Sequence, residues 1–169
     1  MIDALLQDLL DYVRNRYFGK YRGVVVDVDA ATMRVKASVP SVLGGVTSGW
    51  AAPCVPYAGP QVGFMMLPDI GSGVWIEFEG GDVSFPIWTG CYWNSGDIPS
   101  AASATLKTII ATAGSLAFDN SAGSTTLQDA NQHTVVADSS GVTITGAPAS
   151  IVAVGAASVS INNGAFEVM

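Results

Sequence analysis

A short apolar repeat in residues 107–169 constrains the fold of this chain more than any other feature. One large apolar residue recurs there at spacings of 9, 8, 9, 8, 9 and 7 residues. The repeated positions are Phe118, Leu127, Val135, Ile144, Val152, Ile161 and Val168. Apolar and small or polar residues alternate around them, which is typical of strands that bury one face. Asn, Asp, Ser and Gly separate the units and favour tight turns.

Strands this short cannot build a two-sided core within one chain. Units of eight or nine residues are also too short for a one-chain β-helix, whose coils take roughly twenty or more residues. Three copies wound around one axis would supply three walls and a shared apolar centre. The repeat therefore predicts that residues 107–169 form one third of an intertwined trimeric β-prism, with the seven repeated residues as its core. An ordinary meander or a disordered Ser/Gly/Ala-rich tail is the alternative.

The composition supports burial of apolar surface between subunits. Only 12% of the residues are charged, and the mean hydropathy is +0.39. The sequence contains no uninterrupted run of eighteen apolar residues, so no membrane-spanning helix is expected. Association between copies is then the expected way to cover the apolar surface. The first residues, MIDALLQDLL, lack a basic stretch, so no secretory signal is expected.

The charges are unevenly distributed along the chain. Residues 1–36 hold six basic and five acidic residues, for a net charge of +1, whereas residues 37–169 hold one basic and nine acidic residues, for a net charge of −8. Binding to nucleic acid depends on Lys and Arg that neutralise phosphates. A nucleic-acid partner is therefore not expected. Cys54 and Cys91 have no CxxC spacing and are predicted to be small buried apolar residues.

Residues 2–17 have the pattern of an amphipathic helix. Apolar residues recur at three- and four-residue spacing, with Asp, Gln, Asn and Arg on the other face. The apolar stripe includes Leu5, Leu6, Leu9, Leu10 and Val13. Two interpretations stay open. The stripe either packs on the chain's own domain or docks on a partner.

From Lys20 the apolar period changes to two, which indicates strands. Strands are expected at residues 20–29, 32–39, 62–68, 72–82 and 85–93, with a long ordered Gly- and Pro-rich loop at residues 40–61. Five strands with one long loop match the number and spacing of strands in an OB-type barrel. Residues 94–106 are expected to be the linker to the prism.

The barrel segment also carries a recognisable motif. Its elements are Pro68 and Gly71, the strand Val74-Trp75-Ile76 with Phe78-Glu79, the turn Gly80-Gly81-Asp82, and Pro86-Ile87-Trp88-Thr89-Gly90. This arrangement resembles the OB-fold spikes of contractile tails, the family of phage baseplate assembly protein V and VgrG-like spikes. The following residues 107–129 are similar to the start of the triple-stranded β-helix in that family. The resemblance covers roughly residues 18–169.

The resemblance implies a mainly β chain in four parts. These are an amphipathic N-terminal helix (1–18), an OB-fold domain (19–93), a linker (94–106) and an intertwined trimeric β-helix spike (107–169). The implied function is structural and not enzymatic. The chain would be the homotrimeric, membrane-piercing central spike of a contractile phage tail or related injection system. It would belong to a virion tail baseplate or injection-system particle assembled in the bacterial cytoplasm.

The resemblance also implies partners. A hub or baseplate protein is expected at the N-terminal side, and contact with the target cell envelope is expected to be transient. A PAAR-like tip protein is expected at Phe166, Val168 and Met169, because these residues would leave an apolar patch with free strand edges. The sequence departs from some family members in three ways. It has no lysozyme-like insert, no paired iron-binding histidines at its end and no fused hub domain, so a separate hub protein is expected.

Other chemistry has weaker support in the sequence. His133 is the only histidine, so a metal site would need three copies to converge, and no cofactor is expected. Glu77 and Glu79 point to one face of a predicted strand and would suit a peptidoglycan hydrolase if they lay in a cleft. Trp50, Trp75, Trp88 and Trp93 would suit an OB-type glycan-binding fibre module if they formed a stacking platform. The alternative interpretations, a core or interface role for the Trp residues and a solvated strand face for the acids, remain open.

Overall fold

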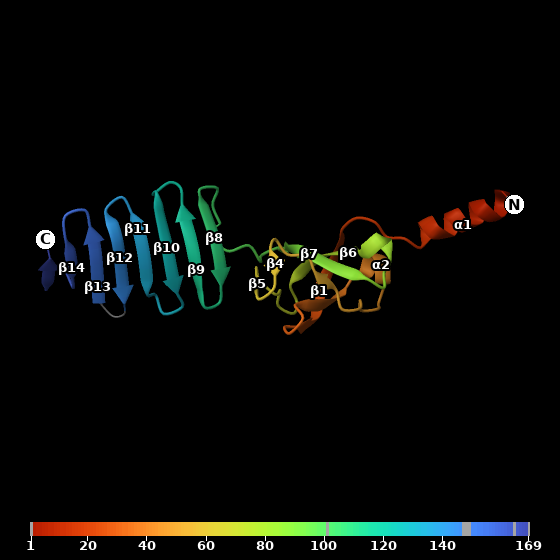
Figure 1. The fold of residues 1–169 in the computed structure, drawn as a ribbon, viewed down its shortest axis with the longest axis horizontal. Helices are drawn as coiled ribbons and strands as arrows, with labels where there is room; N and C mark the ends of the chain where they lie inside the picture. Colours follow the sequence, from red (N-terminus) through yellow and green to blue (C-terminus); the bar gives the residue numbers. More distant parts are fainter. Residues whose placement is uncertain (1, 101, 147–149, 164, 169) are drawn as a thin grey trace. The chain divides into compact units, whose positions relative to one another are not determined.

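The computed structural model describes residues 2–100, 102–146, 150–163 and 165–168. The chain divides into two compact units, Met1–Ile98 and Pro99–Met169, which Figure 1 shows as ribbons. Both units are built mainly from β-strands, which confirms the predicted fold class. Within the described ranges, none of the helices combines the length and apolar character needed to cross a membrane.

The first unit contains a curved five-stranded sheet. Its helices and strands are α1 (Ile2–Arg14), β1 (Tyr21–Asp29), β2 (Arg34–Ser38), α2 (Pro40–Leu43), β3 (Ala52–Pro53), β4 (Ala58–Gly59), β5 (Val62–Gly63), β6 (Gly73–Phe78), the 3-10 turn η1 (Glu79–Gly81) and β7 (Pro86–Tyr92). The strand order is β2-β1-β6-β7-β3, and β4 and β5 form a separate two-stranded sheet. Val35 in β2 and Ala51 beside β3 exchange backbone hydrogen bonds of 3.4 and 2.8 Å. This bridge joins the two outer strands, so the sheet closes into a barrel.

Alternation along the strands places one set of side chains inside the barrel. In β2, Val35 and Ala37 are fully buried, while Arg34 is exposed. The core consists of Val25, Val35, Ala37, Val39, Ala51, Val74, Ile76, Phe78 and Trp88. The indole Nε1 of Trp88 donates a 3.0 Å hydrogen bond to the Met33 carbonyl, so its one polar atom is satisfied inside.

The N-terminal helix is shorter than the predicted span of residues 2–17. It ends at Arg14, because Tyr17 belongs to the barrel. The Tyr17 N–H donates to the Gly81 carbonyl at 2.9 Å, and the Tyr17 ring meets Tyr21 and Phe78 edge-on at centroid distances of 6.3 and 6.4 Å. Arg16 adds an ion pair to Asp82 at 3.0 Å. Tyr17, which the spacing predicted to be the last apolar residue of the helix, therefore packs in the barrel.

Two other predictions for the first unit are wrong. The expected strand at residues 62–68 exists only as the two residues of β5, and Phe64, Met65 and Met66 are exposed. Cys54 and Cys91 are exposed free thiols and not buried apolar residues. Although Cys91 is exposed as a residue, its thiol is partly buried, and this burial raises the pKa of the thiol.

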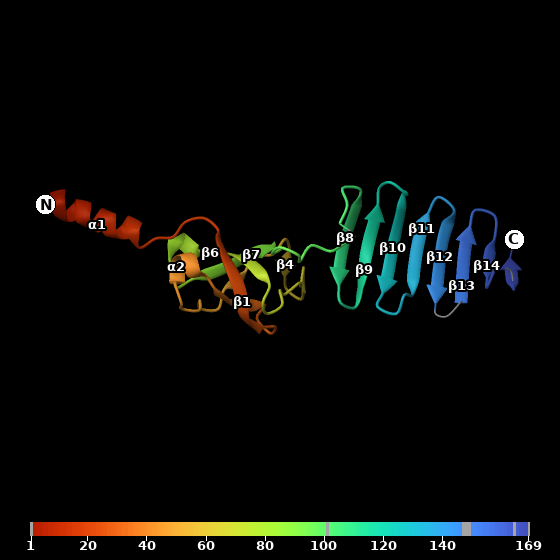
Figure 2. The same ribbon diagram turned by 180° about the vertical axis from the view of Figure 1, so that it is seen from behind.

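The second unit is one antiparallel meander of eight strands. The strands are β8 (Leu106–Ala111), β9 (Gly114–Asp119), β10 (Ser124–Asp129), β11 (Thr134–Asp138), β12 (Gly141–Gly146), β13 (Ser150–Gly155), β14 (Val159–Ile161) and β15 (Phe166–Val168). Each strand pairs with its neighbours in sequence, in the order β15 to β8. Figures 1 and 2 show the strands side by side from opposite sides. The ladder hydrogen bonds of one chain thus run within that chain, and intertwining with other copies stays a prediction.

The meander begins with a strand, β8, that contains none of the seven predicted core residues. β8 starts at Leu106, inside the expected linker, and pairs with β9 over its whole length. Its apolar residue Ile109 lies nine residues before Phe118, so the repeat itself extends back to β8. The preceding turn residues Asn94 and Asp97 belong to the first unit and are hydrogen-bonded to each other at 3.0 Å.

Candidate trimer interface and docking surfaces

The strand register places one large apolar residue of every strand in a single row across the meander. Residues directly opposite each other in an antiparallel pair point to the same face. Leu127 pairs with Val135, and Val135 pairs with Ile144. The complete row, called the apolar row below, is Ile109, Leu116, Leu127, Val135, Ile144, Val152, Ile161 and Phe166.

A second row lies two residues along each strand on the same face. It consists of Lys107, Phe118, Thr125, Ala137, Val142, Val154, Val159 and Val168. The seven predicted core residues therefore all lie on one face, five in the apolar row and two, Phe118 and Val168, in the second row. The sequence interval selected Phe118, which lies nine residues before Leu127, whereas the strand register places Leu116, eleven residues before Leu127, in the apolar row.

The opposite face of the meander carries smaller and more polar side chains. The central row on that face runs through Thr108, Ala117, Thr126, Val136, Thr143, Ala153 and Ser160. Such residues suit contact with water. The sheet therefore has one face built for burial and one built for solvent.

The apolar face is uncovered in a single chain. The described part of the second unit contains one sheet and no second layer of helix or strand. Leu127 is 54% exposed and Ile144 is 47% exposed although both lie in the middle of the apolar row. A sheet must bury its apolar face against another layer to be stable. The described residues of the second unit do not themselves supply that layer.

Aspartates fix the turns at the strand ends. Asp119 accepts hydrogen bonds from the Ser121 hydroxyl at 2.6 Å and from the Ser121 and Ala122 N–H groups. These donors, the hydroxyl first, hold the pKa of Asp119 below its usual value of 3.8. In the next turn on the other side, the backbone N–H of His133 is the main cause that lowers the pKa of Asp129, followed by the His133 ring.

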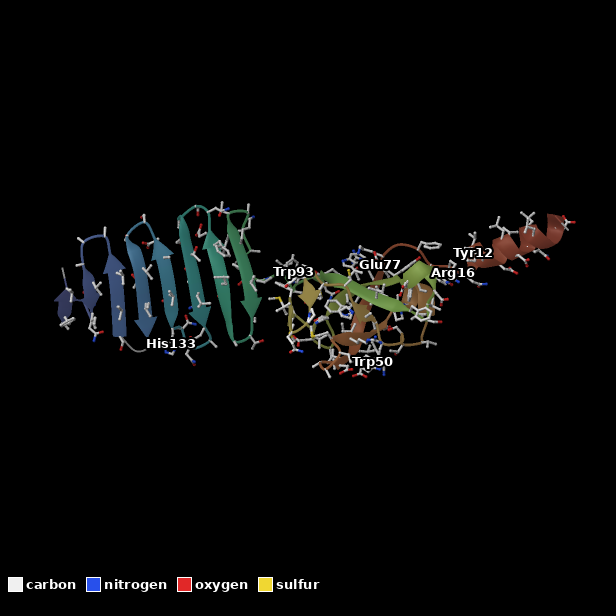
Figure 3. The ribbon with its side chains drawn as sticks, in the orientation of Figure 1. Tyr12, Arg16, Trp50, Glu77, Trp93 and His133 are labelled. Carbon is white, nitrogen blue, oxygen red and sulfur yellow. The ribbon has the colours of Figure 1, made fainter. Side chains whose placement is uncertain are left out.

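His133 is held by the turn in which it lies (Figure 3). Its Nδ1 lies 2.8 Å from the Asp129 carboxylate. The pair borders a shallow hollow of about 280 Å³ that Leu127, Val135 and Ile144 also line. Among the residues that the structure describes, no group of three or more His, Cys, Asp or Glu side chains is placed to hold a metal ion. The arrangement is that of a capped turn at the rim of the apolar face.

The predicted docking residues of the N-terminal helix are exposed. Within α1 the exposed fractions run from 44% for Leu10 to 73% for Leu5. The set comprises Leu5, Leu6, Leu9, Leu10 and Val13. These side chains are therefore uncovered in the single chain. Figure 3 marks Tyr12 and Arg16, where the guanidinium lies 5.2 Å from the Tyr12 ring centroid just before the barrel begins.

The predicted tip residues lie on the last strand of the meander. Among the strands that the structure describes, β15 pairs with β14 alone. Phe166 is 60% exposed and Val168 is 53% exposed, and both point to the apolar face. Met169 lies outside the described residues. An edge strand of this kind offers unpaired backbone groups to another chain.

The two glutamates considered for catalysis have other surroundings. Glu77 in β6 forms an ion pair of 3.0 Å with Lys20 on the outside of the barrel. Glu79 begins the η1 turn and lines a shallow hollow with Arg16, Asp82 and Phe85. The η1 turn, rather than the strand, holds Glu79, which the strand pattern did not reveal.

The four tryptophans do not form one surface. Trp88 is 4% exposed in the barrel core, so its ring cannot stack on a sugar. The centroids of the Trp75 and Tyr92 rings lie 5.2 Å apart, and the Arg22 guanidinium lies beside both rings. Lys36 Nζ lies 4.4 Å from the centroid of the Trp50 ring. Trp93, at 66%, is the most exposed of the four and follows β7 (Figure 3).

Comparison with known proteins matches both units. Residues 21–93 match the type VI secretion system/phage-baseplate injector OB domain. Residues 105–167 match the phage baseplate V C-terminal trimerisation domain. No curated protein matches the chain.

Both family matches agree with the geometry of their units. The first match spans the closed barrel from β1 to β7, and the second spans the meander from β8 to β15 with its uncovered apolar face. The trimerisation domain accounts for the missing layer, because the chain forms a homotrimer. Both domains are structural components of virions or injection particles. The chain belongs to the phage baseplate V family, whose OB and trimerisation domains together cover most of its length.

Proposed function

We propose that three copies of this chain form the central, membrane-piercing spike of a contractile phage tail or related injection system. In this proposal α1 docks on a hub or tube protein, the meanders of three copies form the shaft, and the β15 end carries a tip protein. The observation that carries the proposal is the apolar row, which runs unbroken through all eight strands.

The apolar row gives the shaft the stiffness that piercing requires. Three apolar faces that pack on each other would bury every strand of the meander along one continuous core. Because the core is shared between the chains, one strand cannot separate without exposing apolar surface on all three. The outward faces would carry the Thr, Ser and Ala rows, and residues 106–169 hold one basic and four acidic residues, for a net charge of −3. Such a surface has little attraction for anionic lipid head groups.

Counting the copies in purified particles tests this function. A central spike is expected at three copies per tail, measured by quantitative mass spectrometry against a tail protein of known copy number. A glycan-binding fibre module would lie at the periphery and follow the sixfold or higher multiplicity of fibres. A count of six or more trimers per particle would therefore contradict the spike and support the fibre.

We further propose that a small conical PAAR-like protein caps the β15 end. The purified trimer is expected to capture such a protein when it is co-expressed with neighbouring small reading frames. Val168→Lys combined with Met169→Lys should abolish capture, because two added charges per chain oppose burial of an apolar contact.

Ser160→Lys provides the matched control, since Ser160 lies on the polar face of β14. It should leave capture intact. Particles without any capping protein, in which the three C-terminal ends close the apex themselves, would contradict the proposed cap.

A further inference from the structure

A second apolar surface lies on the barrel of the first unit. Every residue from Pro56 to Met66 is exposed. The large apolar side chains of this segment are Tyr57, Val62, Phe64, Met65 and Met66, with exposed fractions from 42% to 75%. No Asp, Glu, Lys or Arg occurs between Lys36 and Asp69. Contiguous apolar surface of this kind marks an interaction site.

The segment, called the apolar hairpin below, is ordered by its own hydrogen bonds. β4 and β5 pair as Ala58 with Gly63 and Gly59 with Val62. The Phe64 N–H donates to the Tyr57 carbonyl at 2.8 Å. One side of the hairpin also lines a hollow of about 170 Å³ together with Met33, Pro53 and Val55 of the barrel. A surface that is already ordered loses little entropy when a partner covers it.

The hairpin lies at the end of the barrel where β7 finishes, as both views show (Figures 1 and 2). Leu67 and Pro68, which follow the hairpin, line one hollow with Tyr92 and Trp93 at the end of β7. The trimerisation domain begins at residue 105, and the first unit ends at Ile98. A connection of seven residues spans at most about 25 Å. In a trimer, the end of each barrel must therefore lie within about 25 Å of the start of its own trimerisation domain.

We propose that the apolar hairpin packs against a second copy of this chain, so that the barrels form a trimer interface of their own. The proposal rests on the homotrimer and not on the spike function. Three arguments favour a second copy as the occupant: the absence of charge, the preformed hairpin, and the short connection to the domain that brings three copies together. Permanent interfaces between copies are typically apolar in this way.

Thiol labelling of the purified trimer tests the proposal. In a Cys54→Ser, Cys91→Ser background, Met65→Cys is compared with Phe85→Cys at the other end of β7. In the single chain Met65 is 75% exposed and Phe85 is 60% exposed, so equal accessibility would give similar maleimide rates. The proposal expects labelling at Met65→Cys to be roughly ten-fold slower, because the neighbouring barrel covers it. Similar rates at the two positions in the trimer would overturn it and leave the hairpin to a different protein.

Charge substitution supplies an independent measurement on the full chain. Met65→Glu with Met66→Glu should leave the trimer mass unchanged, because the meanders hold the copies together. It should lower the melting temperature of the barrel and speed hydrogen exchange at the Phe64 N–H. Phe85→Glu should change neither value. A barrel transition that Met65→Glu with Met66→Glu leaves unmoved, or that Phe85→Glu moves equally, would overturn the proposal.

Discussion

Replacing Ile144 with aspartate is expected to abolish trimer assembly. Ile144 lies in the middle of the apolar row, between Val135 of β11 and Val152 of β13. Three copies of the substitution would bring three carboxylates together in the shared core. Burying an unpaired charge costs on the order of several kcal/mol per ion, and nothing basic in the apolar row would compensate. Light scattering should then report the mass of one 17.4 kDa chain in place of three.

The next residue in the chain provides the matched control. Thr143 lies on the opposite face of β12, in a row of small and polar side chains. Thr143→Asp adds the same charge to the same strand, so it should leave the trimer mass intact. An Ile144→Asp protein that remains trimeric with an unchanged melting temperature would show that the apolar row is not the core of the trimer.

Removal of residues 1–14 is expected to leave a folded trimer that no longer enters particles. The apolar residues of α1 are exposed in the chain, so their loss should cost the barrel little stability. The truncation stops before Arg16 and Tyr17, because these residues pair with Asp82 and pack against Phe78. Particle incorporation should fall to background, measured by immunoblot of purified particles.

Substitutions within α1 show whether incorporation depends on the apolar side chains of the helix or only on the presence of the helix. Leu6→Asp with Leu9→Asp places charge in the apolar stripe, whereas Asp8→Ser with Asp11→Ser changes only the polar side. The first pair should block incorporation and the second should permit it. If the truncated trimer loses solubility instead, the helix covers its own barrel and the docking role is contradicted.

The spacing of apolar residues was sufficient to predict the strands β9 to β15 of the second unit and the face that carries their large apolar side chains. The alternation of apolar and polar residues predicts where the strands lie and which of their side chains share a face. The turns are predicted by Asp, Asn and Gly, as in the turn at Asp119. β8 was missed because Ile109 and Ile110 are consecutive apolar residues, which hide the alternation. The pairing of strands within one chain was also not predictable, since the same alternation suits a strand from a neighbouring copy.

The first unit was less predictable because its long excursion depends on tertiary contacts. The run VGFMMLP has strand composition, but it lies outside the five-stranded sheet and only Val62 and Gly63 pair. Tyr17 continued the helical spacing although its ring packs in the barrel. Cys54 follows β3 and is exposed, and composition alone could not reveal this position. The docking surfaces were identified by residue type, and their partners stay proposals.

An electron cryo-microscopy map of an intact particle would locate the chain and its apolar row together. We expect one trimer of this chain on the particle axis, with α1 against the hub and the β15 end pointing away from the tube. In that map Ile144 and the rest of the apolar row should face the threefold axis, and Thr143 should face solvent. A chain at the periphery would rule out the central spike, and an apolar row turned outward would rule out a trimer core built from that row.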